Sequence, residues 1–177
     1  KLKAEGVRMV IYPSKGCMDK YDKDMTKIQQ RMEEIVSDII KKNQMRKKYQ
    51  SDLFKECQAQ IDRENLDDLI LIHAEDAHEG IAGIVAGKIK ETYYRPAIIV
   101  TATGSDGDDL KGTGRSVEGI NLYELLKTQE DLFLKFGGHA GACGFSLKRE
   151  NLEALRKGLA SEMAKICEVN PDIFTKK

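Results

Sequence analysis

The sequence predicts an α/β domain in which a mixed sheet is flanked by helices, with a long amphipathic connector helix before it. After residue 67, apolar runs of strand length alternate with helical patterns, and this alternation is typical of layered α/β folds. The turn at residues 104–109 is centred on Asp-Gly, which predicts a hairpin and therefore an antiparallel strand pair. From Asp22 to Ile61 a helical stripe continues without Gly or Pro, which predicts one long helix.

The connector helix has a narrow apolar face, because its apolar residues repeat at spacings of three and four. A basic cluster at residues 41–48 is either a solvated helix face or a stripe that follows phosphates. Upstream, the apolar run Val7–Tyr12 ends at Pro13 and is typical of one short strand. The apolar seam consists of Met25, Ile28, Met32, Ile35 and Ile39.

After the connector we expect the order strand, helix, strand, strand, helix, strand and helix. The first of these strands is apolar throughout, as expected of a strand that is covered on both faces. Asn121 is a predicted helix cap, with Glu124 three residues later. The expected ranges are 69–72, 80–93, 96–102, 110–115, 121–133, 142–147 and 151–169.

Composition and charge limit the function classes. The chain has 177 residues, 33% of them charged, and its formal net charge is zero. This neutrality argues against a broad DNA-coating surface, so any nucleic acid is expected in a local pocket. No apolar run approaches the ~20 residues of a membrane span, so no membrane partner is expected. The four cysteines form no Cys-x-x-Cys pair, which favours free thiols in a reducing cytoplasm and predicts no metal site.

Three glycine-bearing segments are candidates for the site, and the first is His78–Gly87. Glycine costs about 1 kcal/mol inside a helix relative to alanine. Close packing of helix on sheet explains Gly83 and Gly87 without any ligand. His78 and Gly80 stand at the predicted helix start, where free backbone amides attract anions such as phosphate.

The second candidate segment is Lys111–Ser116. Its two glycines allow close approach of the backbone to a ligand. Thr113 and Ser116 offer hydroxyl groups, and Arg115 offers a planar fork suited to phosphate. The alternative interpretation is a hairpin edge with an ordinary surface arginine.

The third candidate segment is Phe136–Phe145. Gly137 and Gly138 precede His139, so a tight turn here presents successive amides and an imidazole to an anion. A plain glycine turn with a surface histidine is the alternative.

Together, these segments resemble the DHH-associated domain of RecJ-type exonucleases, which belong to the DHH phosphoesterase superfamily. The resemblance covers residues 69–169. It departs from the family at Ala77, where Trp is common, at Thr113, which replaces Ser, and in the His139 loop at Gly141 and Cys143. The matching motifs are His78-Glu79-Gly80-Ile81-Ala82-Gly83-Ile84-Val85-Ala86, Arg95-Pro96-Ala97-Ile98, Gly112-Thr113-Gly114-Arg115-Ser116 and Phe136-Gly137-Gly138-His139-Ala140-Gly141-Ala142.

The resemblance implies the substrate-gripping part of a 5′-to-3′ single-stranded-DNA exonuclease. It assigns Arg115 and Thr113 to a terminal phosphate, and His139 with the Gly137 and Gly138 amides to a phosphate near the scissile bond. His78 and Ser116 are further candidates for the same groove. The implied partners are single-stranded DNA and an N-terminal DHH domain.

That DHH domain is expected to hold Mn²⁺ or Mg²⁺ that activates water. This chain contains no Asp-His-His triplet, so we expect it to bind no cofactor itself and to be inactive alone. The implied segments are 1–21, the end of a preceding domain or a linker; 22–66, the connector; 67–170, the DHH-associated domain; and 171–177, a tail.

Two alternatives stay open. A DHH-family oligoribonuclease or nucleotide phosphoesterase would keep the fold and change the substrate. A non-catalytic docking module would use the apolar seam to bind a partner helix, and its glycine loops would then be structural.

Overall fold

A computed structural model describes residues 2–4, 7–9, 18–62, 64–103 and 108–175, with side chains from Ile28 onward. The chain divides into two compact units, residues 1–48 and 49–177. In the first, β1 (Leu2–Ala4) pairs antiparallel with β2 (Val7–Met9). The rest of the strand predicted at 7–12 and the Asp-Gly turn at 106–107 lie outside the described residues.

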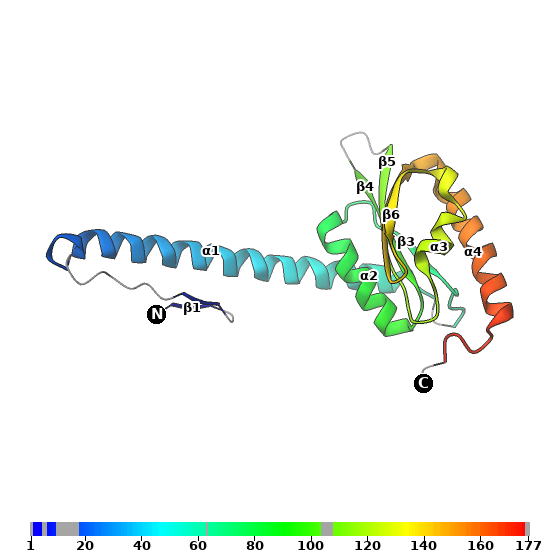
Figure 1. Ribbon diagram of the computed structural model, residues 1–177, viewed down its shortest axis with the longest axis horizontal. Coiled ribbons are helices and arrows are strands. Elements are labelled where there is room, and N and C mark those ends of the chain that lie inside the picture. Colours follow the sequence, from blue (N-terminus) through cyan, green and yellow to red (C-terminus); the bar gives the residue numbers. More distant parts are fainter. Residues whose placement is uncertain (1, 5–6, 10–17, 63, 104–107, 176–177) are drawn as a thin grey trace. The chain divides into compact units, whose positions relative to one another are not determined.

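The long helix predicted from the apolar seam is confirmed as α1 (Met18–Ala59) (Figure 1). The seam is largely open to solvent, since Ile28 and Ile35 are both 47% exposed and Ile39 is 61% exposed. No side chain in residues 28–48 is buried. In the second unit the end of the same helix buries Leu53 and Cys57. Tertiary packing therefore holds the end of α1, whereas its earlier turns depend on helix propensity.

A mixed sheet forms the centre of the second unit, as predicted, but it has five strands and not the four expected from the sequence. Its order is β3-β4-β5-β7-β6. β3 and β4 run parallel, whereas the other neighbouring pairs are antiparallel. The strands are β3 (Ile70–His73), β4 (Ala97–Thr103), β5 (Asp109–Arg115), β6 (Phe133–His139) and β7 (Ala142–Lys148).

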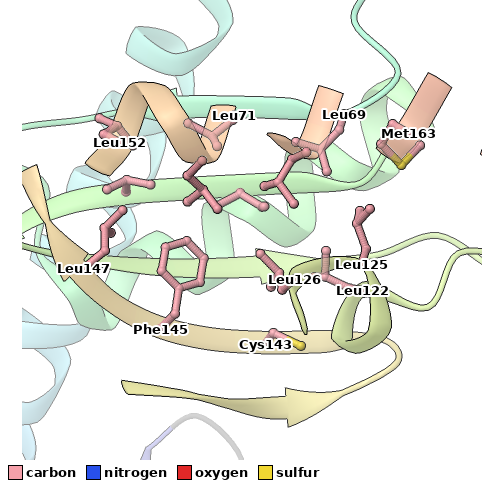
Figure 2. Packing of buried hydrophobic residues seen from close by; sticks show 14 of the residues in the cluster. Leu69, Leu71, Leu122, Leu125, Leu126, Cys143, Phe145, Leu147, Leu152 and Met163 are labelled. Carbon is pink, nitrogen blue, oxygen red and sulfur yellow. The ribbon is translucent and has the colours of Figure 1, made fainter. Parts of the chain in front are cut away.

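Helices cover the two faces of this sheet unequally (Figure 1). α2 (Glu79–Tyr93) and the end of α1 pack on one face, over apolar side chains of β3 and β4. α3 (Leu122–Lys127) and α4 (Leu152–Val169) pack on the other, where side chains from β3, β4, β5 and β7 join one core (Figure 2). On the α2 face of β7 and β6, Gly144, Gly137 and His139 are exposed. Half of that face therefore lacks a helical cover within the described part of the chain.

The predicted helix at 121–133 is too long and hides a strand. α3 ends at Lys127, a short 3₁₀ turn follows at Glu130–Leu132, and β6 begins at Phe133. The register shifts between Phe133 and Lys135. Such a bulge breaks the period of two, and paired glycines lack strand propensity, so the pattern of apolar residues alone did not reveal β6.

The paired glycines of β6 have different reasons to be glycine. Gly138 has φ of +148°, a conformation that side chains disfavour. A Cβ there would lie 2.6 Å from Cys143 Cα and closer still to the Ala142 carbonyl oxygen. A Cβ on Gly137 would meet nothing within 4 Å. The fold therefore requires glycine at 138 but not at 137.

Replacing Gly138 by Ala should lower the free energy of unfolding by about 2 kcal/mol or more, because the backbone of β7 must move. Gly137→Ala is the matched control and should change it by less than about 0.5 kcal/mol. Urea unfolding followed by circular dichroism measures both. Equal losses in the two variants would contradict the close packing of β6 on β7.

Candidate functional site

Residues from three neighbouring strands share the α2 face of the sheet, with β5 beside α2 and exposed positions on β7 and β6. In β5, Lys111, Thr113 and Arg115 alternate with Gly112 and Gly114, and alternate residues of a strand face opposite ways. Directly paired residues share a face, so the register extends each of the three into a row. The rows are Arg115, Ala142 and His139; Thr113, Gly144 and Gly137; and Lys111, Ser146 and Lys135.

Arg115 and His139 therefore face the same side of the sheet, two strands apart. With ~4.8 Å between neighbouring strands, their backbones are about 10 Å apart. The sequence-based prediction that both side chains act on one ligand stays a prediction, because the register shows a shared face only. We define the second and third rows, together with the first turn of α2, as the sheet-face groove.

The sheet-face groove is a hollow of about 520 Å³. Its floor is low because the second row contains glycines from β6 and β7, Gly137 and Gly144. Arg115 and His139 lie in the next row of the same face, beyond Thr113 and Gly137. The lining residues are Glu79, Gly80, Ala82, Thr101, Lys111, Gly112, Thr113, Lys135, Phe136, Gly137, Gly144, Phe145 and Ser146.

Arg115 lies against the small face of α2. A Cβ on Gly83 would approach Arg115 Nη2 to 3.2 Å and Thr113 Oγ1 to 3.4 Å. Arg115 Nη1 donates a hydrogen bond to its neighbour's carbonyl, Gly114 O, at 2.9 Å. Within the described ranges no carboxylate lies at salt-bridge distance from this guanidinium. Gly83 thus makes room for a half-buried cation whose charge is not neutralised by a described neighbour.

His139 is exposed at the start of the turn that joins β6 to β7. Its Nδ1 accepts a hydrogen bond from the Gly141 amide at 3.2 Å. In the neutral ring this leaves Nε2 as the protonated nitrogen and a donor toward solvent. The Cys143 thiol donates to the His139 carbonyl oxygen at 3.3 Å. Burial raises the pKa of that thiol, so it stays protonated and can donate at neutral pH.

The third row carries an ion pair and a second lysine. Lys111 Nζ lies 2.6 Å from Glu79 Oε2. This hydrogen bond with Lys111 lowers the pKa of the Glu79 carboxyl group, so the carboxylate stays charged and compensates Lys111. Lys135 has no carboxylate within salt-bridge distance among the residues that the structure describes. In that part of the chain, the uncompensated positive charges on this face are therefore those of Arg115 and Lys135.

The two glycines of β5 make room for side chains of the core. The Phe145 ring occupies the space beside Gly112, and a Cβ on Gly114 would lie 2.7 Å from Leu122 Cδ2. The sequence suggested that these glycines let a ligand approach. The structure shows that they admit Phe145 and Leu122 on the core side. Gly112 also lines the hollow, so the approach of a ligand there stays a prediction.

Two predicted site residues lie away from the groove. His78 caps α2, accepting the Gly80 amide at Nδ1 over 3.0 Å, and it lines a separate pocket beside Tyr49 and Asp52. Ser116 is buried, and its Oγ donates to the Ile120 carbonyl oxygen at 2.8 Å. Arg115, Thr113, Gly137 and His139 therefore lie in neighbouring rows of one face, whereas Gly138 pairs with buried Cys143 and alternates with them. His78 and Ser116 are not part of these rows.

Sequence reasoning missed Lys135 and Ser146. Lys135 belongs to β6, the strand that the apolar pattern hides behind a helix end and a loop. Its signal was the spacing of two in Lys135, Gly137 and His139, which is the period of a strand face. Ser146 shares that row only through the register of β7, which no local pattern reveals.

The described residues do not fit a metal centre. Among them, no group of three or more His, Cys, Asp or Glu side chains could hold an ion. In the same part of the chain, no helix is long and apolar enough to span a bilayer.

Comparison with known proteins places the domain. Residues 67–165 match the family described as the DHHA1 domain. The single-stranded-DNA-specific exonuclease RecJ of Bacillus subtilis is 35% identical over 128 residues, which is 72% of this chain and 16% of that protein. RecJ of Salmonella typhimurium is 41% identical over 93 residues, or 50% of this chain and 16% of that protein.

Structural comparison agrees. The crystal structure of RecJ from Thermus thermophilus in complex with Mn²⁺ has a TM-score of 0.65 at 30% identity, covering 73% of this chain and 19% of that chain. This chain thus spans less than a fifth of these relatives. The same family is matched by sequence motif, by family model and by fold, and the chain belongs to the DHHA1 domain family in the form carried by RecJ.

Proposed function

We propose that this chain is the nucleic-acid-gripping part of a RecJ-type exonuclease that degrades single-stranded DNA from the 5′ end. The observation that carries the proposal is the row formed by Arg115, Ala142 and His139 on one face of the sheet. Arg115 lies beside α2, whereas His139 is exposed. A low floor with cationic and neutral donors along it fits a flexible, negatively charged backbone. The RecJ relatives are named as specific for single-stranded DNA.

Arg115 and Thr113 would hold the terminal phosphate. A guanidinium forms two parallel hydrogen bonds to phosphate oxygens, and a hydroxyl donates a third. Both side chains lie against Gly83 of α2, so the helix limits their rotation and lowers the entropy lost on binding. The same contact explains a helix glycine that packing of the apolar core alone does not require.

His139 would hold the phosphate nearer the scissile bond. Its Nε2 remains free to donate while Nδ1 is held by the Gly141 amide. β6 is an edge strand, so half of its backbone amides face away from β7. Successive amides of a strand point to opposite edges, so only one of the Gly137 and Gly138 amides faces away from β7. We assign that free amide to the same phosphate as His139.

The chemistry of hydrolysis would come from an N-terminal DHH domain. Two divalent cations there, Mn²⁺ or Mg²⁺, would activate the attacking water and stabilise the leaving oxygen. RecJ has been crystallised with each of these metals. We derive no catalytic step from the present residues, and we propose that the domain acts with its partner domain on DNA in the cytoplasm.

Replacing Arg115 by Ala should weaken binding of a 5′-phosphorylated oligo(dT) by about 10-fold to 100-fold, because a charged hydrogen bond to phosphate is lost. The variant should also lose the preference for a 5′-phosphate over a 5′-hydroxyl. Fluorescence anisotropy with a 3′-labelled strand measures both affinities. Arg149→Ala is a control that removes a guanidinium engaged with Glu75. An unchanged phosphate preference in Arg115→Ala would contradict the proposal.

The chain alone should bind such strands without cutting them. Incubation with Mn²⁺ and a 5′-phosphorylated strand, followed by gel electrophoresis, is expected to show the intact oligonucleotide. Steady release of mononucleotides by the purified chain would show that its own residues supply the catalytic metals, and the division of labour proposed above would be wrong.

The nucleotide phosphoesterase alternative predicts another outcome of the binding measurement. A site built for very short substrates would bind a phosphorylated dinucleotide as tightly as a longer strand. The groove and the row beside it extend over three rows of the sheet, which favours the longer ligand.

A further inference from the structure

The third row of the sheet-face groove has its own means of binding an anion. Lys135, Ser146 and Lys111 lie side by side across β6, β7 and β5. The bulge between Phe133 and Lys135 lets Phe133 and Phe136 both join the core, where their rings stack at 5.5 Å. Lys135 is thereby left on the groove face. Bulges often redirect a side chain beside a functional site.

This row is too far from Arg115 to serve the same phosphate. Lys111 and Arg115 are four residues apart on β5, or about 13 Å along the strand. Stacked nucleotides rise ~3.4 Å each, so this distance corresponds to about four of them. An extended strand covers it with fewer nucleotides, but with more than one.

The second row, which lies between Arg115 and Lys135, contains two glycines that the packing of the fold does not require. A Cβ on Gly137 would meet nothing within 4 Å, and one on Gly144 would meet only Gly112 O at 3.8 Å. Alanine would therefore fit at both positions in the chain alone. Two glycines side by side keep the floor low, so that a backbone can pass from Arg115 to Lys135.

We infer that Lys135, with Ser146 and Lys111, forms a second phosphate subsite that holds an internal phosphate of the strand whose end is held at Arg115. Lys135 supplies the uncompensated charge, Ser146 a hydroxyl, and Lys111 a charge shared with Glu79. The inference rests on the proposed function and adds a length requirement to it. Strands too short to reach the third row would bind through the Arg115 end only.

The decisive measurement is affinity against strand length for 5′-phosphorylated oligo(dT) of two to eight nucleotides. For the wild-type chain, affinity should rise once the strand reaches the third row. Lys135→Ala should weaken the eight-nucleotide strand by about tenfold, and lower its salt slope by about 0.7, the value for one phosphate contact on a single strand. Binding of the dinucleotide should change less than twofold, and Lys135→Arg should restore the rise.

Lys157→Ala is the matched control, because it removes one exposed lysine from α4, on the opposite face of the sheet. A Lys135→Ala chain that keeps the full rise with length, or that loses equal affinity for two and eight nucleotides, overturns the second subsite. If Arg115→Ala leaves dinucleotide binding unchanged, the proposed function fails instead, so the two failures are distinguishable.

The open floor gives an independent test. Gly144→Val should leave the fold intact, with an unchanged urea midpoint, because β-branched residues suit strands and space is available. It should reduce binding of the eight-nucleotide strand by about tenfold or more, while dinucleotide binding falls less than twofold. Undiminished binding of the long strand would show that no backbone passes over Gly144, and the path to Lys135 would be excluded.

Discussion

The packing of Phe145 beside Gly112 is the contact on which the site depends. The absence of a side chain at Gly112 and Gly114 lets Phe145 and Leu122 close the core against β5. Because strand residues alternate, fixing the glycines inward also fixes Thr113 and Arg115 outward. A one-residue slip of register would bury the guanidinium and break the core together. The same register of β5 therefore determines both the packing of Phe145 and Leu122 in the core and the direction of Thr113 and Arg115.

The small face of α2 extends this coupling to a second element. Its buried residues, such as Val85 and Ile89, hold the helix on β3 and β4. Gly83 instead leaves space for Arg115 and Thr113. A Cβ on Gly87 would meet nothing within 4 Å. Close packing of the helix on the sheet, which the sequence predicts at both glycines, is therefore found at Gly83 but not at Gly87. A glycine inside a helix can thus leave the space that a cationic side chain of the neighbouring sheet occupies, as Gly83 does for Arg115.

Sequence reasoning identified the layers and the long helix, because each depends on local periodicity. It singled out Arg115 and His139 as candidates from short glycine-bearing motifs, and the register places both on one face of the sheet. It did not find β6, where a bulge and two glycines remove the strand period. It predicted that Gly112 and Gly114 let a ligand approach. The register of β5 with β7 decides which side chains pack beside these glycines, and no local pattern reveals that register. Lys135 escaped for the same reason, since only pairing across strands places it beside Ser146.

The proposed function requires a chain of zero net charge to bind a polyanion. A formal net charge of zero gives no long-range attraction, so the local field must act at short distance. Glu79 compensates Lys111 at one end of the groove, so Arg115 and Lys135 are the cations on this face without a carboxylate at salt-bridge distance among the described residues. On the proposed path, a strand end with its extra phosphate charge would lie beside Arg115, and an internal phosphate would lie beside Lys135. The proposed function therefore depends on two cations at opposite ends of one sheet face, each acting on the phosphate next to it and not through the net charge of the chain.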